Sequence, residues 1–337
     1  MWILLGTALG REPHFETWAE KQAPPATHPD RAEGWDFAAE LWHRVLAVVQ
    51  EDPGWVEPVL VGRSVEKRPI WGFRVSSPAV SAERKLLVFS QLHALEWIGA
   101  EVSVALLEEL VQERPEGVEI MIVPIVNPDG RWRSEQDLLF EDHRAYRRAN
   151  ANGVDLNRDF AFNREPDTIW ARAPYTRNYF TSSPGPLSQP ETQALDALMA
   201  AEGFDVGVDL HSYGGYIEYP WAGTSERSPD WSQMASRGQR MAEAQPGRAY
   251  GVIQLSHFVF FFRGLGMSID HMHGKYGMEA YLIELTRSGL SIRDPSSFRD
   301  YFRWYNPVDK GPHVEMGLAA LMQLIHELGE EAALAGH

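Results

Sequence analysis

The sequence contains no cysteine among its 337 residues. Disulfide bonds, thiolate metal sites and cysteine nucleophiles are therefore excluded, and a bound metal must be held by histidine, aspartate or glutamate. Long apolar runs are missing as well. A membrane-spanning helix needs about 18 apolar residues or more, and the aromatic run at 258–262 is far shorter. We expect no membrane span, and we expect residues 258–262 to form a buried strand or a pocket wall.

Positive charge is scarce. The chain has 31 Lys and Arg residues against 47 Asp and Glu residues, which gives a net charge of −16. This balance argues against nucleic acid or an anionic membrane as a main partner, although a local basic cluster can still bind a carboxylate. Apolar residues at 44% and charged residues at 23% are typical of a globular protein.

The N-terminal ten residues are apolar but lack the basic flank of a signal peptide. We expect an edge strand or a buried segment there, and both a cytoplasmic and an exported location remain open. The proline-rich stretch at 22–30 reads as a loop. It predicts an N-terminal extension, residues 1–33, followed by one catalytic domain, residues 34–337.

Helical and extended patterns alternate along the domain. Helices are expected at 35–51, 98–113, 188–201, 231–244 and 311–332, and strands at 55–75 (a pair), 85–90, 118–126, 206–210 and 280–285. A turn is expected at 127–130. The alternation favours an α/β fold in which a mixed, mostly parallel central sheet has helices on both faces.

Three residues suggest a metal site. His93 and Glu96 form the only His-x-x-Glu pair of the chain, directly after an expected strand, and His211 follows another. Ligands in open α/β sheets bind beyond the carboxyl ends of strands. Two histidines and one glutamate are a common ligand set of catalytic zinc, which keeps a further position open for water. The three residues therefore predict a zinc site.

Further motifs follow in a fixed order. They are HALEW at 93–97, VNPDG at 126–130, AYRR at 145–148, GVDLNRDF at 153–160, DLHSYGGYIEYPW at 209–221, GMSID at 266–270 and IELTRSG at 283–289. With these motifs the chain resembles the zinc metallocarboxypeptidase family of the carboxypeptidase A type. The resemblance implies a zinc carboxypeptidase-like α/β/α sandwich, one Zn²⁺ per chain on His93, Glu96 and His211, and peptide or protein C-termini as partners.

The resemblance also assigns catalytic roles. Glu284 matches the glutamate that acts as general base toward the attacking water and then protonates the leaving amine. Arg147 matches the arginine that polarises the scissile carbonyl and stabilises the oxyanion. Arg144 and Arg148 flank it, so the register within this basic run stays open.

The GVDLNRDF motif implies recognition of a chain end. Asn157 and Arg158 match the pair that binds the terminal carboxylate of the substrate, for which the planar guanidinium is well suited. Asp155 matches a carboxylate that orients the first zinc histidine. Asn157 and Arg158 would distinguish an exopeptidase from a general zinc endopeptidase.

The specificity pocket gives mixed signals. Tyr213 is expected to contact substrate. Ile269 aligns with the base of the pocket and suits apolar or aromatic C-terminal side chains, whereas an acid at Glu218 would favour Lys or Arg. The family often has an arginine where Leu95 stands, and a mobile tyrosine where the count reaches Phe262. The substrate-capping residue is therefore left unassigned.

The sequence predicts a zinc-dependent carboxypeptidase that hydrolyses the C-terminal peptide bond. One alternative is a related zinc amidase that acts on cell-wall peptides or acylated amino acids. Another is a peptide-binding relative without catalysis, although such relatives usually lose a ligand or the glutamate. The resemblance favours secretion, while the oligomeric state and any proenzyme control stay open.

Overall fold

The computed structural model describes residues 14–140, 146–165, 183–258, 263–287 and 298–335. The apolar N-terminal ten residues lie outside them. Eight strands form one sheet in the order β1-β2-β4-β3-β5-β8-β6-β7. They are β1 (Val56–Arg63), β2 (Pro69–Val75), β3 (Arg84–Ser90), β4 (Val118–Val123), β5 (Val206–Ser212), β6 (Tyr216–Tyr219), β7 (Gly251–Gln254) and β8 (Glu279–Leu285).

The sheet is parallel at its centre and mixed toward its edges, where β6 and β7 also pair in parallel. Strands β4, β3, β5 and β8 pair in parallel, whereas β1 with β2, β2 with β4 and β6 with β8 are antiparallel. The prediction of a mixed, mostly parallel sheet is therefore confirmed.

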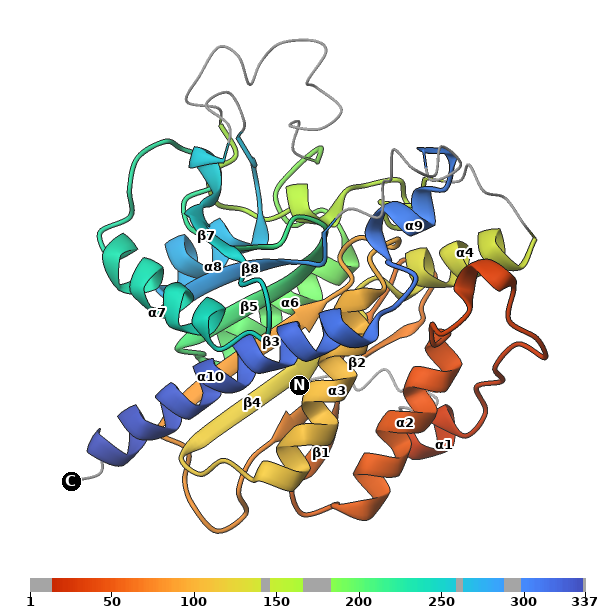
Figure 1. Ribbon diagram of the computed structural model, residues 1–337, viewed down its shortest axis with the longest axis horizontal. Coiled ribbons are helices and arrows are strands. Elements are labelled where there is room, and N and C mark those ends of the chain that lie inside the picture. The colour runs from red at the N-terminus through yellow and green to blue at the C-terminus, as the bar shows by residue number, and fades with distance from the viewer. Residues whose placement is uncertain (1–13, 141–145, 166–182, 259–262, 288–297, 336–337) are drawn as a thin grey trace, which may run out of the picture.

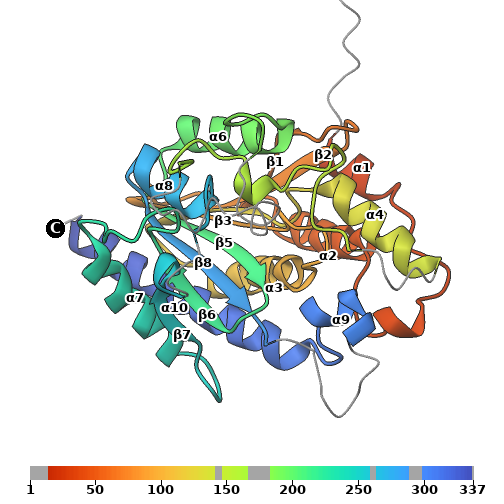
Figure 2. The same ribbon diagram turned by 90° about the horizontal axis from the view of Figure 1, so that it is seen from above.

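Helices cover both faces of the sheet. They are α1 (Phe15–Ala19), α2 (Ala38–Glu51), α3 (Ile98–Glu113), α4 (Pro128–Leu139), α6 (Pro190–Glu202), α7 (Trp231–Glu243), α8 (Ser268–Tyr276), α9 (Tyr301–Tyr305) and α10 (Gly311–Ala335). Figures 1 and 2 show α2, α3, α7 and α10 on one face, with α6 and α8 on the other. No helix among the described residues is long and apolar enough to cross a membrane.

The burial of the central strands on both faces explains why their sequences are apolar. In β3, Leu86 and Val88 enter the core on one face of the sheet, while Leu87 and Phe89 enter the core on the other. A strand covered on both faces has no polar side, so it reads as a continuous apolar run. This burial places His93 and His211, which follow or end such strands, at the rim of the sheet.

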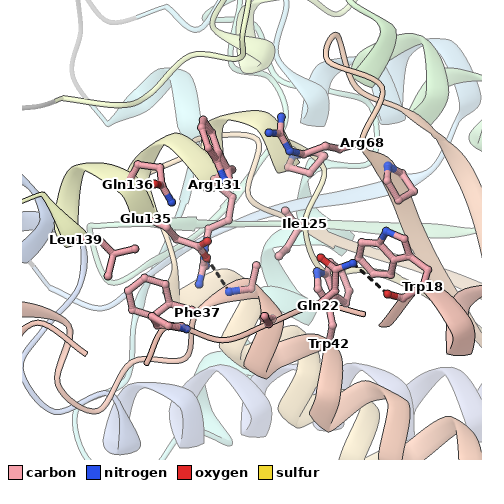
Figure 3. A pocket seen from close by; sticks show the side chains of 17 residues that line it. Trp18, Gln22, Phe37, Trp42, Arg68, Ile125, Arg131, Glu135, Gln136 and Leu139 are labelled. Carbon is pink, nitrogen blue, oxygen red and sulfur yellow. Dashed lines mark hydrogen bonds and ion pairs between the residues drawn. The ribbon is translucent and has the colours of Figure 1, made fainter. Parts of the chain in front are cut away.

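The start of the chain packs on the same body. Phe15 of α1 is buried, and its ring centroid lies 4.9 Å from that of Phe73 in β2. A cavity of about 360 Å³ lies between this segment and α4. Trp18 and Trp42 are among the side chains that line it (Figure 3). The buried Arg131 beside it donates hydrogen bonds to Glu135 Oε1, Gln91 Oε1 and the Asp36 carbonyl. The domain boundary after residue 33 stays a prediction.

Two local expectations need correction or restriction. The turn expected at 127–130 is wrong: α4 begins at Pro128, and the Asn127 side chain caps it by accepting from the Gly130 N–H at 2.9 Å. Proline at the first position of a helix and asparagine at the cap favour this start as much as a turn. Of the run at 258–262, only Phe258 is described; it is half exposed and faces the cavity treated below.

Candidate metal centre and active site

The register of strands β5, β8 and β6 arranges the site residues in two rows across the sheet. In the outer row, His211 of β5, Glu284 of β8 and Tyr216 of β6 are direct neighbours. Side chains two residues apart on a strand point to the same face. The row nearest the carboxyl end of β5 therefore places an imidazole, a carboxylate and a phenol side by side.

The inner row lies two residues farther from that end. It consists of Asp209, Leu282 and Glu218, which are again neighbours across β5, β8 and β6. Asp209 is completely buried beneath His211, whereas Leu282 and Glu218 line the cavity. The register thus places two carboxylates, those of Asp209 and Glu218, below the outer row.

Three donor groups converge at the rim. His93 Nδ1 lies 2.9 Å from Glu96 Oε1, and His211 Nδ1 lies 2.8 Å from Glu96 Oε2. The two Nδ1 atoms are 3.0 Å apart. All three side chains are buried, and their ligand atoms lie within 4.8 Å of one another. The structure therefore brings together the three residues predicted to hold a metal.

Each histidine is oriented from behind. His93 Nε2 lies 3.0 Å from Asp155 Oδ1, and His211 Nε2 lies 2.9 Å from Asp209 Oδ2. Carboxylates in this position fix the ring and its tautomer, and so leave Nδ1 free to bind a metal. The donor set, its burial and the two carboxylate–histidine pairs fit a zinc ion.

The charges at this centre are strongly coupled. Burial would raise the pKa of Glu96, but His93 and His211 outweigh it and hold that pKa well below its usual range. Burial opposes the charging of His211, but Asp209 and Glu96 raise its pKa well above the ordinary value. Glu96 is therefore ionised, as a metal ligand must be.

The two neighbouring arginines point in different directions. Arg147, with an exposed side chain, donates from Nε to Asp137 Oδ2 at 2.5 Å. Arg148 lines the cavity, donates from Nε to Asp155 Oδ2 at 2.7 Å, and brings Nη1 within 3.6 Å of Glu96 Oε1. Arg148 therefore faces the cavity and the metal-binding triad, whereas Arg147 points to Asp137 on α4, and Arg144 lies outside the described residues.

Asn157 and Arg158 lie in a short 3₁₀ turn, Leu156–Arg158, and both line the cavity. The Asn157 amide oxygen accepts from the Ser268 N–H at 2.9 Å, and the Arg158 guanidinium donates to the Asn157 carbonyl at 2.6 Å. Burial, only partly offset by Asp155, lowers the pKa of Arg158 to about 10. Arg158 is still a cation at neutral pH and offers a fixed site for an anionic group.

Asp155 links these parts. One oxygen faces His93 Nε2 and accepts from the Asn157 N–H at 3.0 Å, while the other accepts from Arg148. Burial would raise the pKa of Asp155, but Arg148 and His93 hold it well below its usual value. A single carboxylate thus orients a metal-binding histidine, the inward arginine and the chain segment that carries Asn157.

Glu284 is in the opposite electrostatic state. Burial first, and then the charge of Glu96, raise its pKa well above the ordinary value. Its Oε2 atom is buried and has no hydrogen-bond partner among the described residues. A carboxyl group of this kind takes up a proton readily, which suits transfer to and from a substrate.

The site lies in two adjoining cavities of about 550 and 470 Å³. Both are lined by Arg148, Tyr213 and Glu284. The larger one alone reaches His93, Arg158 and Glu218, together with an apolar wall of Leu255, Met267 and Leu282. The region around Glu284 and Arg148 is therefore the junction between a deep cavity and an outer one.

Of the predicted pocket residues, Tyr213 and Glu218 line the deep cavity. Ile269 does not; it is fully buried in the core beneath α8 with Leu156 and Phe160. Position 262 lies outside the described residues, so the expected capping position cannot be placed.

A family model for zinc carboxypeptidases matches residues 43–298. The chain belongs to the zinc carboxypeptidase family. Among curated proteins it is 23% identical to carboxypeptidase O of Bos taurus over 55% of this chain and 52% of that protein. It is 27% identical to a metallocarboxypeptidase A-like protein of Trichophyton verrucosum over 69% and 58% of the two chains. The chain spans only about half the length of these relatives.

Solved structures of zinc carboxypeptidases share the fold. Carboxypeptidase A from Helicoverpa armigera superposes with a TM-score of 0.69 at 22% identity, over 89% of this chain and 74% of that chain. Thrombin-activatable fibrinolysis inhibitor gives a TM-score of 0.67 at 19% identity, over 86% of this chain and 73% of that chain. At these identities the likeness concerns the fold.

Sequence reasoning missed several residues of this zinc carboxypeptidase site. Asp209 could have been found, because it precedes His211 by two positions on one strand and must share its face. Tyr305 had no such signal: it comes from α9, yet its ring centroid lies 5.2 Å from that of Tyr213 and its hydroxyl 2.9 Å from that of Tyr146. Only the tertiary fold brings this tyrosine to the rim.

Proposed function

We propose that the chain is a zinc-dependent carboxypeptidase that hydrolyses the C-terminal peptide bond of peptides or proteins. The observation that carries the proposal is the grouping, around two adjoining cavities, of a metal-binding triad, a buried acid and an arginine–asparagine pair. The triad and acid alone would suit any zinc peptidase. Asn157 and Arg158 would bind a carboxylate, and they therefore favour a substrate with a free C-terminus.

Substrate binding would begin at the floor of the deep cavity. Arg158 and Asn157 hold the terminal carboxylate, since a buried guanidinium pairs well with a planar anion. This places the C-terminal side chain inside the deep cavity and the rest of the peptide in the outer one. The scissile bond then lies at the junction, beside Arg148 and Glu284.

Bond cleavage would use both of these residues. Zinc held by His93, Glu96 and His211 would polarise the scissile carbonyl and lower the pKa of the attacking water. Glu284 accepts a proton from that water as the new C–O bond forms. Arg148 stabilises the negative charge on the former carbonyl oxygen. Glu284 then gives the proton to the amide nitrogen as the C–N bond breaks, which releases an amine and a carboxylate.

The proposal is tested with two peptides of one sequence, one with a free C-terminal carboxylate and one with a C-terminal amide. After treatment with a chelator, the protein should release one residue from the free-ended peptide only when zinc is restored, and it should leave the amidated peptide intact. Equal cleavage of both peptides, or internal cleavage, would refute carboxypeptidase action. Cleavage of muropeptides without cleavage of ordinary peptides would favour the amidase alternative.

A further inference from the structure

Glu218 is a buried acid to which the proposed reaction gives no role. It lies on β6 in the inner row, next to Leu282, and its side chain reaches the deep cavity. Only 6% of the residue is exposed. Within the described part of the chain, its carboxylate forms no hydrogen bond or ion pair.

Three of the described residues that line the deep cavity carry a carboxylate, and two of them are already engaged. Asp155 is bonded to Arg148 and faces His93. Glu284 lies at the junction and serves the proton transfer proposed above. Glu218 lines only the deep cavity, whereas Glu284 lines both cavities, so Glu218 lies on a wall that the C-terminal side chain would face.

The surroundings of Glu218 are apolar. Leu255, Met267 and Leu282 line the same cavity. A buried carboxylate without a partner is costly unless it is neutralised or meets a cation. Burial raises its pKa to about 8, although the charge of His211 acts in the opposite direction. A positively charged group on a ligand would stabilise the ionised form of Glu218.

We propose that Glu218 selects substrates whose C-terminal residue carries a cationic side chain, of the lysine and arginine class. The inference rests on the proposed function, because it takes Arg158 as the anchor of the terminal carboxylate. The apolar wall would hold the methylene stem of such a side chain while its charged end pairs with Glu218. The carboxylate of the substrate would pair with Arg158, so the cationic end of its side chain would face the acid of Glu218.

The placement of Ile269 removes the main argument for an apolar preference. Its side chain lies in the core rather than on the cavity wall. The apolar residues that do line the cavity accompany the Glu218 carboxylate, which forms no hydrogen bond or ion pair with the residues that the structure describes. An aromatic C-terminal side chain would bury that carboxylate further without pairing it.

The test uses zinc-loaded protein and four peptides that differ only in a C-terminal Lys, Arg, Leu or Phe. Wild type should show kcat/KM for Lys and Arg at least about tenfold above that for Leu and Phe, because a well-placed charged pair adds about 1.4 kcal/mol or more. Glu218→Gln and Glu218→Leu should lower the Lys and Arg values by roughly 10- to 100-fold and change the Leu and Phe values by less than about threefold. Glu226→Gln, which alters an exposed acid, is the matched control.

Failure of this inference differs from failure of the proposed function. Release of Leu or Phe in preference to Lys and Arg would overturn the role of Glu218, as would a basic preference that both Glu218 variants retain. Release of no residue from any peptide would count against the proposed function instead. In that case, calorimetric binding of the same peptides decides: binding of Lys and Arg ends that is lost in Glu218→Gln supports the inference, and binding without preference overturns it.

Discussion

Two buried glutamates within one site stand in opposite electrostatic states. Glu96 is 2% exposed and Glu218 is 6% exposed, so burial is nearly the same. Glu96 has two imidazoles and the Ser212 N–H around it, and its pKa lies far below the usual range. Glu218 has no such partners among the described residues, and its pKa rises to about 8. Partners, rather than burial, decide the charge of each acid.

This difference suggests that the acids along the cavity have different roles. Acids with partners, such as Glu96 and Asp155, are fixed in their ionised form and can hold a metal or orient its ligands. Acids that have no hydrogen-bond partner in the described part of the chain, such as Glu284 at Oε2 and Glu218, can exchange a proton or pair with a charge on the substrate. Variants that remove one of these acids, or one of the groups around it, test this difference one residue at a time.

The largest effect is expected at the proton-transferring acid. Glu284→Gln keeps the shape of the side chain but cannot accept a proton, so kcat for a free-ended peptide should fall by roughly 10²- to 10⁴-fold. Steady-state release of the C-terminal residue measures this. Glu226→Gln should match wild type, and substantial turnover by Glu284→Gln would contradict the assigned base.

The next effect separates the adjacent arginines. Arg148→Ala should lower kcat by about 10²- to 10³-fold, because it removes the guanidinium that faces the developing charge. Arg147→Ala removes an exposed side chain paired with Asp137 and should change kcat by less than about threefold. The two variants are compared with one peptide at saturating zinc. The reverse order would restore Arg147 to the role that the sequence first suggested.

A smaller effect is expected at Asp155, the carboxylate that orients His93. Asp155→Asn should weaken zinc affinity by roughly 10- to 100-fold, because it removes the charge that orients and strengthens His93. Competition with a chromophoric chelator gives the dissociation constant. Asp137→Asn, at an acid that pairs with the outward Arg147, is the control. Unchanged affinity in Asp155→Asn would mean that this carboxylate orients Arg148 alone.

The smallest effect concerns stability and pH. The pKa of Glu218 rises in the folded state from 4.5 to about 8. Its protonated form therefore stabilises the fold below about pH 4.5, and this contribution is lost as the pH rises through about 8. In metal-free protein, Glu218→Gln should gain stability relative to wild type across that window, by on the order of a few kcal/mol. Urea unfolding at about pH 5 and about pH 9 checks this, and a constant difference would mean that Glu218 is ionised throughout.

Much of the fold could be predicted from local pattern. Strand β3 and helix α3 are a continuous apolar run and an amphipathic repeat, and each signal lies within its own element. The short strand β6 was not foreseen, because its four residues pair with β8 far along the chain. The start of α4 was misread because Asn-Pro also begins turns.

The site shows a similar limit. Motif spacing is enough to identify His93, Glu96 and His211, because their order along the chain carries the resemblance. It cannot decide which of two adjacent arginines turns inward, because that depends on the loop backbone around Asp155. It also cannot tell that Ile269 points into the core, which depends on how α8 packs on the sheet.

The most direct test of the central claim is a set of zinc-binding isotherms for wild type, Glu96→Gln and Glu284→Gln. If partnered and unpartnered acids divide the work as described, Glu96→Gln loses zinc affinity by roughly 100-fold or more, because a buried ligand charge is gone. Glu284→Gln should bind one zinc per chain as wild type does. Equal loss in both variants, or loss in Glu284→Gln alone, would contradict the division of roles between the two glutamates.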